Sequence, residues 1–217
     1  MDCPLPIDDK EYVQLAHGSG GRMMHQLLSR MLPIVGRARL GQTDSAVLQI
    51  GGRRLAFTTD TYVVSPHFFA GGNIGTLAVC GTVNDLAMVG ARPLYLSLAL
   101  LLEEGFSIEH LERILTTIRT CADAAGVEIV TGDTKVVDHG KGDGIFINTA
   151  GIGIVEHSLV LAPSAVRPGD AVIVSGDLGR HGIAVLAQRE GLAFDTTIES
   201  DVTCLHHAVG HLLAAGL

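Results

Sequence analysis

The sequence predicts a folded protein that contains both helices and strands. Two short apolar runs, residues 46–50 and 53–58, flank Gly51-Gly52, a pattern typical of a β-hairpin. Across residues 107–125 apolar side chains recur at three- and four-residue spacing, and Gly126 follows, which predicts a helix with a glycine stop. Of the 217 residues 47% are hydrophobic and 18% charged, so the apolar surface can offset the chain entropy and disorder is excluded.

The other elements are predicted from the same signals of periodicity, apolar runs and capping residues. In chain order they are an apolar-periodic stretch at 23–31, a helix capped by Asn73 that ends at Gly90, a buried strand at 94–102, strands at 127–131 and 144–155, a short strand at 171–175, a helix that begins with 183–189, and a helix near the C-terminus.

The composition changes between residues 156 and 170, where Pro163 and Pro168 interrupt the apolar pattern. We therefore expect three parts: an N-terminal Gly-rich segment at 1–40, a first domain at 41–157, and the start of a second domain at 158–217. The last part has too few elements to close a core alone.

Charge and composition exclude several classes of protein. The net charge is −8 and Lys and Arg form no cluster, so no nucleic-acid partner is expected. No secretory signal and no apolar run of about 20 residues is visible, so no membrane association is expected. The four cysteines lie far apart without a Cys-x-x-Cys pair, which fits a reducing cytoplasm. Cys80 and Cys121 lie on apolar helix patterns and are interpreted as core residues.

Four aspartates at turn-like positions are the candidate metal ligands: Asp44, Asp60, Asp85 and Asp133. Asp60 and Asp133 are expected at the ends of apolar strands, where carboxylates can converge at one sheet edge and bind Mg²⁺ together with substrate phosphates. Taken singly, each aspartate is more typical of a turn or cap residue. Asp85 interrupts an otherwise apolar helix, and a buried carboxylate there would need a cation or hydrogen-bond donors.

Two further features could contact phosphate. The loop Gly18-Ser19-Gly20-Gly21 can present backbone N–H groups to an anion, although it is not a Walker A loop and could be a simple turn. Lys135, two residues after Asp133, could reach a phosphate as a point charge or lie solvated on the surface.

Long motifs resemble the HypE family of hydrogenase expression/formation (maturation) proteins, carbamoyl dehydratases of the PurM/AIR synthetase superfamily. The resemblance covers nearly the whole chain from about Leu15, in the segments 15–23 (LAHGSGGRM), 58–66 (TTDTYVVSP), 78–88 (AVCGTVNDLAM), 128–137 (EIVTGDTKVV) and 175–182 (SGDLGRHG).

The resemblance implies a PurM-like α+β fold. Its N-terminal domain, residues 41–157, would bind ATP and contribute strands to a β-barrel shared by a homodimer, and an incomplete second α/β domain would follow. ATP with Mg²⁺ would lie in a cleft reached by the Gly-rich segment. The implied ligands of metal and phosphate are Asp44, Asp60, Asp85 and Asp133, supported by Asn84 and Thr134, with Lys135 as the catalytic residue beside the phosphates.

The family dehydrates a carbamoylated C-terminal cysteine to a thiocyanate with ATP. The cyanide then goes to the iron of nickel–iron hydrogenase, and HypF (the carbamoyl donor) and the HypC–HypD complex (the cyanide acceptor) are the implied partners. Family members end in Pro-Arg-Ile-Cys or a close variant, whereas this chain ends at Leu217. We therefore expect a C-terminally truncated chain that is incomplete for full turnover.

Two alternatives stay open. One is a catalytically incompetent module that binds nucleotide and dimerises. The other is a different ATP-dependent enzyme of the PurM superfamily. Selenophosphate synthetase is disfavoured because its Gly-rich segment carries a reactive Cys or selenocysteine and a Lys, where this chain has Ser19 and Arg22. Thiamine-monophosphate kinase is disfavoured because its Gly-Asp-Asp-Ala motif appears here as Thr43-Asp44-Ser45-Ala46.

Overall fold

The computed structural model describes residues 12–36, 43–192 and 194–216, and the chain divides into two compact units between residues 42 and 43. The first unit contains a short 3-10 helix, η1 (Leu15–Gly18), and the helix α1 (Arg22–Val35). The apolar-periodic stretch at 23–31 is therefore helical. The boundary expected between residues 157 and 158 stays a prediction.

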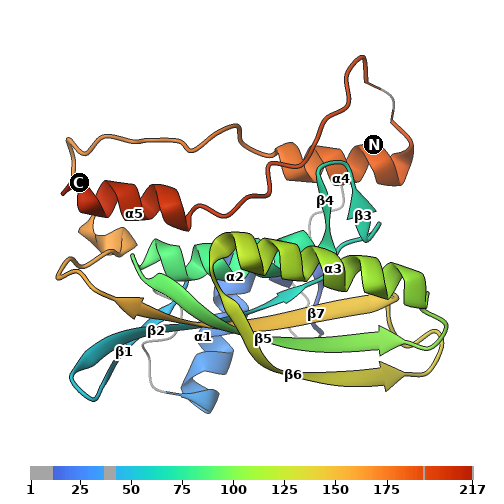
Figure 1. Cartoon of the computed structure of the whole chain (residues 1–217), viewed down its shortest axis with the longest axis horizontal. Helices are drawn as coiled ribbons and strands as arrows, with labels where there is room; N and C mark the ends of the chain where they lie inside the picture. The colour runs from blue at the N-terminus through green and yellow to red at the C-terminus, as the bar shows by residue number, and fades with distance from the viewer. Residues whose placement is uncertain (1–11, 37–42, 193, 217) are drawn as a thin grey trace. The chain divides into compact units, whose positions relative to one another are not determined.

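The second unit is built around a five-stranded sheet in the order β1-β2-β7-β5-β6 (Figure 1). The strands are β1 (Ala46–Ile50), β2 (Arg53–Tyr62), β5 (Arg92–Glu103), β6 (Glu128–Val137) and β7 (Ile145–Val155). The predicted hairpin is confirmed, because β1 and β2 pair antiparallel around Gly51-Gly52. Both glycines have positive φ, +57° and +77°, as a tight two-residue hairpin turn requires.

Two helices, α2 (Ile74–Met88) and α3 (Ile108–Ala125), cover one face of this sheet (Figure 1). The Asn73 side chain caps α2 by accepting a hydrogen bond from the Gly75 amide at 2.8 Å. The helix ends at Met88, two residues before the predicted stop. Helix α3 begins after its cap Ser107 and stops at Gly126, as predicted, and it joins the parallel strands β5 and β6.

The core lies between these helices and the sheet. Helix α2 is buried along much of its length, and its apolar side chains pack against those of α3, β5 and β7. The fully buried members of this core include Ile74, Val79, Val83, Leu86, Leu96, Ile114, Ile118, Ile145 and Ile147. Among the described residues of this unit, no helix lies on the opposite face of the sheet (Figure 1).

The remaining elements are short. They are β3 (Phe68–Phe69), β4 (Gly72–Asn73), η2 (Pro163–Ala165), α4 (Arg180–Glu190) and α5 (His206–Ala214). The two predicted C-terminal helices are thus confirmed. Among the described helices, none has the length and apolar character that a membrane crossing requires.

Two sequence-based predictions about strands are wrong. Residues 171–174 are irregular, and Val172 is 91% exposed, because no strand among the described residues pairs with this apolar run. Asp60 and Asp133 do not end their strands. β-Branched residues after each aspartate continue the pairing, so β2 extends to Tyr62 and β6 to Val137.

Candidate functional site

A buried hydrogen-bond network fixes α2 on the sheet. The Tyr62 hydroxyl hydrogen-bonds the Thr82 hydroxyl at 2.9 Å, Thr82 also hydrogen-bonds Thr149, and Thr149 Oγ1 donates to the carbonyl of Ala78 at 3.0 Å. Gly81 allows this approach, since a Cβ there would overlap the Tyr62 ring. Burial raises the pKa of Tyr62 and keeps its hydroxyl neutral. The network therefore fixes the distance of α2 from the sheet and the rotation of α2 about its own axis, one helical turn before Asp85.

Asp85 lies half-buried on α2 and faces β2. The Thr58 hydroxyl lies 2.8 Å from Asp85 Oδ2 and 3.0 Å from the Asp44 carbonyl oxygen, and its one proton can be donated to either. The buried Ser45 hydroxyl donates to the backbone carbonyl of Asp85 at 2.8 Å. These contacts join the segment before β1, strand β2 and helix α2 at one point.

The environment of Asp85 disfavours its charged form. Burial raises the pKa of the carboxyl from its ordinary value of 3.8 to about 6, and the negative charges of Asp60 and Asp44 add to this rise. The hydrogen bond from Thr58 opposes it only in part. A cation beside these three carboxylates would remove this electrostatic cost, which is why the group fits a metal ion bound with an anionic ligand.

The three carboxylates do not form a complete metal site. Asp44 and Asp60 are exposed, and Asp60 Oδ1 accepts the Thr61 amide at 2.8 Å. Among the residues that the structure describes, no group of three or more His, Cys, Asp or Glu side chains could hold a metal ion by itself. A bound Mg²⁺ would therefore take further oxygen ligands from water and phosphate, which is its usual behaviour in nucleotide sites.

Asp133 and Lys135 lie elsewhere in the chain. Strand β6 is three strands from β2, about 14 Å at normal strand spacing. Asp133 is in register with Ala99, Asn148 and Thr61, so it points to the face of the sheet opposite α2 and α3. There its carboxylate pairs with Lys135 Nζ at 3.3 Å, and both side chains are exposed. One copy of the chain therefore does not bring Asp133 or Lys135 to Asp85.

Two more predicted site residues have other surroundings. Thr134 alternates with Asp133 and faces the helix side of the sheet. The Asn84 amide binds the C-terminal segment through both of its polar atoms: Nδ2 donates to the Thr203 carbonyl at 2.9 Å, and Oδ1 accepts the Leu205 amide at 2.7 Å. The role of Asn84 and Thr134 in nucleotide binding stays a prediction.

The Gly-rich loop belongs to the first unit. Gly18 ends η1, and Gly21 is the extended residue before the first turn of α1. Gly20 has φ +75°, which favours glycine. The Ser19 hydroxyl donates to the Ala16 carbonyl at 2.8 Å. The loop thus precedes the N-terminus of a 14-residue helix, an arrangement that can present backbone N–H groups to an anion.

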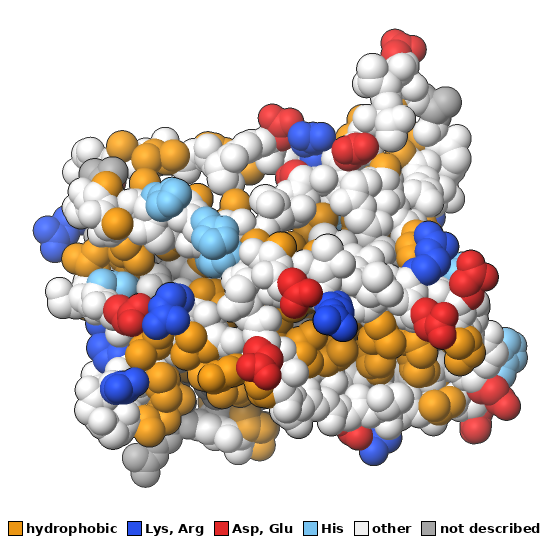
Figure 2. Space-filling view, in the orientation of Figure 1, with side chains coloured by type: hydrophobic (Ala, Val, Ile, Leu, Met, Phe, Trp, Pro, Cys, Tyr) orange, Lys and Arg blue, Asp and Glu red, His pale blue; other side chains and the backbone are white. Residues whose placement is uncertain are grey.

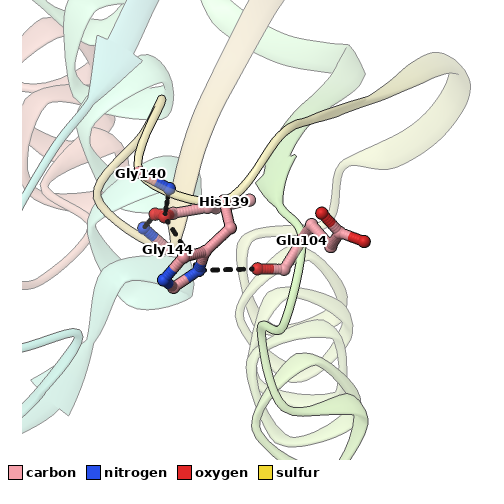
Figure 3. Close-up of polar contacts among 5 residues, drawn as sticks. Glu104, His139, Gly140 and Gly144 are labelled. Carbon is pink, nitrogen blue, oxygen red and sulfur yellow. Dashed lines mark hydrogen bonds and ion pairs between the residues drawn. The ribbon is translucent and has the colours of Figure 1, made fainter.

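A carboxylate that the sequence analysis did not select organises the loop after β6. Glu103 accepts hydrogen bonds from the amides of Gly140 and Gly144, and the His139 ring lies 3.6 Å from Glu103 and 3.4 Å from the Glu104 carbonyl (Figure 3). These amide donors lower the pKa of the Glu103 carboxyl below its ordinary value. The loop that carries Lys141 is thereby tied to the end of β5.

Thr58 and Ser45 were also missed, although the sequence holds one signal for Thr58. It lies two residues before Asp60 on an expected strand, so both side chains point to the same face. Nothing local indicates that this face meets Asp85, which is 27 residues from Thr58 and joins it only through the packing of α2 on the sheet.

Comparison with known proteins places the fold. Residues 42–155 match the family described as "AIR synthase related protein, N-terminal domain". The chain belongs to the AIR synthase-related family. This family's PurM-like fold was predicted from the motifs and is confirmed.

Within the AIR synthase-related family the similarity is to HypE proteins, which confirms the resemblance seen in the motifs. "Carbamoyl dehydratase HypE" of Rhizobium leguminosarum bv. viciae is 53% identical over 207 residues, which cover 94% of this chain and 59% of that protein. The chain thus spans about three-fifths of the length of the curated relatives that it matches.

Two solved structures are also similar. The "HypE-HypF complex" contains a chain that matches with a TM-score of 0.82 and 43% identity, over 90% of this chain and 62% of that one. "Hydrogenase Maturation Protein HypE in complex with ATP" matches with a TM-score of 0.70 and 48% identity, over 93% of this chain and 61% of that one.

Proposed function

We propose that this chain binds ATP with Mg²⁺ at Asp44, Asp60 and Asp85. The observation that carries the proposal is the position of Asp85 on α2, where burial first, and then the charges of Asp60 and Asp44, raise the pKa of its carboxyl to about 6. Such a group is stabilised by a divalent cation, and the structure of a similar protein was solved with ATP. Mg²⁺ bound there would neutralise phosphate charge and orient the nucleotide.

The surroundings of the aspartates fit the rest of a nucleotide. A hollow of about 480 Å³ opens beside Asp44. Its lining is largely apolar and includes Met88, Leu161, Pro163 and Val166, which suits a nucleobase. For the Gly18–Gly21 loop we propose, as the resemblance implies, that its backbone N–H groups bind an anion.

We further propose that the whole protein uses this ATP to dehydrate an S-carbamoyl-cysteine to a thiocyanate for hydrogenase maturation. The amide oxygen is a poor leaving group. Transfer of the γ-phosphoryl group to that oxygen makes it leave as phosphate, and the nitrogen loses two protons as the C≡N bond forms. The products are thiocyanate, ADP and phosphate. Lys135 would stabilise the transferred phosphoryl group.

A homodimer would explain the sheet face that lies opposite α2 and α3. Phe57, Ile152 and Tyr95 form one row across β2, β7 and β5 on this face, and each remains 41–44% exposed. Figure 2 shows a second apolar band, which lies on the helix side of the sheet between α3 and the strands β5 and β6. Val136 of the edge strand β6 points to that side and is 67% exposed. A second copy packed on the face opposite α2 and α3 would bury the row and form a barrel.

The dimer also gives a role to Asp133 and Lys135, which lie on the same sheet face opposite α2 and α3. In a barrel they could approach the nucleotide of the other copy. Phe57→Glu should weaken the dimer by about 30-fold or more, because it puts a charge into an apolar interface. Thr120→Glu, on the exposed surface of α3, is the matched control. Sedimentation equilibrium checks both, and a monomeric unsubstituted chain would contradict the dimer.

The partners and compartment are proposed from the comparisons and the composition. A HypF-like protein is proposed as carbamoyl donor, since a similar chain was solved in complex with HypF. A HypC–HypD complex is proposed as cyanide acceptor on the strength of the motifs. We place the protein in the cytoplasm, where four cysteines would stay reduced.

The catalytic proposal can be tested by supplying the substrate separately. A synthetic peptide ending in Pro-Arg-Ile-Cys, carbamoylated on its sulfur, is incubated with the chain, ATP and Mg²⁺. Mass spectrometry should show loss of one water from the peptide, together with one phosphate released per thiocyanate. Asp85→Asn should abolish both signals. Nucleotide binding without either product would instead support a module that binds nucleotide and dimerises.

A further inference from the structure

Three cysteines that are distant in sequence meet in the second unit. Cys80 is buried on α2, Cys121 is half-buried on α3, and Cys204 is half-buried in the segment before α5. The sulfur atoms of Cys80 and Cys204 lie 3.1 Å apart. Cys121 hydrogen-bonds Cys80 as well, so Cys80 is the central member. Cys3 lies outside the described residues.

The geometry permits a covalent bond between two of these sulfurs. A disulfide has an S–S distance of about 2.05 Å, so Cys80 and Cys204 need to approach by only about 1 Å. Cys204 is outside regular structure, which allows such a small movement, whereas Cys80 is held in the middle of a buried helix.

The electrostatics of the cluster favour reaction at its outer members. The hydrogen bond with Cys80 lowers the pKa of the Cys121 thiol to about 7, and the same interaction lowers the pKa of Cys204. The pKa of Cys80 is raised by its hydrogen bonds to Cys121 and Cys204 and by burial. The thiolate is the reactive form of cysteine, so Cys204 and Cys121 are the entry points for an oxidant and Cys80 is the resolving thiol.

We propose that Cys80, Cys121 and Cys204 form a reversible thiol–disulfide switch that hydroperoxides oxidise and small thiols reduce by disulfide exchange. The thiolate of Cys204 attacks the peroxide oxygen and becomes a sulfenic acid, while the second oxygen leaves and is protonated to water or an alcohol. The sulfur of Cys80 then attacks the sulfur of the sulfenic acid, and the S–S bond forms as the S–O bond breaks. The departing hydroxide takes the Cys80 proton and leaves as water. In sum, two thiols are oxidised and one peroxide is reduced.

The consequence follows from Asn84, which lies one helical turn after Cys80 on the same side of α2. Asn84 already holds the 203–205 segment through two hydrogen bonds. A Cys80–Cys204 disulfide adds a covalent link between the same two elements. Oxidation therefore fastens the segment that leads into α5 to the helix that carries Asp85, and reduction leaves it held by hydrogen bonds that can open.

Cys121 gives Cys80 a second possible disulfide partner besides Cys204. It contacts the same central sulfur from α3, so Cys80 can pair with either neighbour. A Cys80–Cys121 bond would join α2 to α3, two helices that already pack together, and would leave the 203–205 segment free. Only the pairing with Cys204 restrains that segment.

The test uses the full chain with Cys3→Ser, which removes the one cysteine outside the cluster. The protein is treated with hydrogen peroxide, digested under non-reducing conditions and mapped by mass spectrometry. The switch predicts one linked peptide pair, Cys80 with Cys204, that is lost on adding dithiothreitol. When Cys204→Ser is added to the Cys3→Ser protein, the disulfide should instead join Cys80 and Cys121. Oxidation to sulfinic acids without a link, or links that leave out Cys80, would overturn the proposal.

Hydrogen exchange tests the structural consequence in the same samples. The amide of Leu205 should exchange at least about tenfold more slowly in the oxidised protein, because opening of the segment is restrained. The oxidised Cys204→Ser protein is the matched control and should show no such slowing. Equal exchange of Leu205 in oxidised and reduced Cys3→Ser protein would overturn the proposed fastening.

Discussion

Asp85→Asn should make the ligand-free protein more stable at neutral pH. The substitution keeps the shape of the side chain, and the amide oxygen can still accept the hydrogen bond from Thr58. It removes a negative charge from a half-buried position beside Asp44 and Asp60. Since the folded state holds the Asp85 proton more tightly than the unfolded state, ionisation of this carboxyl costs stability as the pH rises.

The size of the effect follows from the pKa of Asp85. A rise from 3.8 to about 6 corresponds to about 3 kcal/mol. Because the carboxyl is half-exposed and therefore screened by solvent, we reduce this to about 1–2 kcal/mol. This loss of stability develops as the pH rises from the pKa of Asp85 in the unfolded state to its pKa in the folded state. At pH 7.5 the whole difference should be present, and at pH 4 only about a fifth of it.

Urea unfolding followed by circular dichroism at pH 4 and pH 7.5 measures this difference. The variant should exceed the unsubstituted chain by about 1–2 kcal/mol at pH 7.5 and approach it at pH 4. Asp123→Asn on the exposed surface of α3, where Asp123 pairs with Arg119, is the control and should show no such gain. A less stable Asp85→Asn protein at pH 7.5, or a difference independent of pH, would refute the reasoning.

Three further outcomes are expected. Glu103→Gln should reduce the amide protection of the loop around Gly140 only above the ordinary Glu pKa, because the folded state lowers the pKa of the Glu103 carboxyl. Amide exchange at pH 7 and at pH 4 measures this protection, and an equal loss of protection at both pH values would contradict the prediction. Asn84→Ala should speed amide exchange at Leu205 by about tenfold, since one hydrogen bond is worth about 1 kcal/mol or more; unchanged exchange would contradict it. Ile147→Ala should destabilise by about 2–5 kcal/mol in urea unfolding, since Ile147 is fully buried; a loss below about 1 kcal/mol would contradict the core.

The sequence predicts the elements of this fold well where the signal is local. The glycine pair of the β1–β2 hairpin, the Asn73 cap and the Gly126 stop each act on adjacent residues, and the structure confirms them. The apolar run at 171–175 failed because a strand also needs a partner, which local pattern does not supply.

The site was predicted less completely because it depends on long-range packing. The Asp85 carboxylate was identified from its conflict with an apolar helix. Its contact with Thr58 and its distance from Asp133 depend on strand order, in which β7 and β5 lie between β2 and β6. The cysteines show the same limit: the sequence pattern predicts Cys80 and Cys121 as core residues, and only the fold brings Cys80 to Cys204.

The central claim is that Asp44, Asp60 and Asp85 bind a magnesium–nucleotide complex. Calorimetric titration with a non-hydrolysable ATP analogue, with and without Mg²⁺, tests it most directly. We predict binding by the unsubstituted chain that depends on Mg²⁺, and at least about tenfold weaker binding by Asp85→Asn, because the loss of a charged ligand costs about 1.4 kcal/mol or more. Equal affinity with and without Mg²⁺, or in the variant, would contradict the claim.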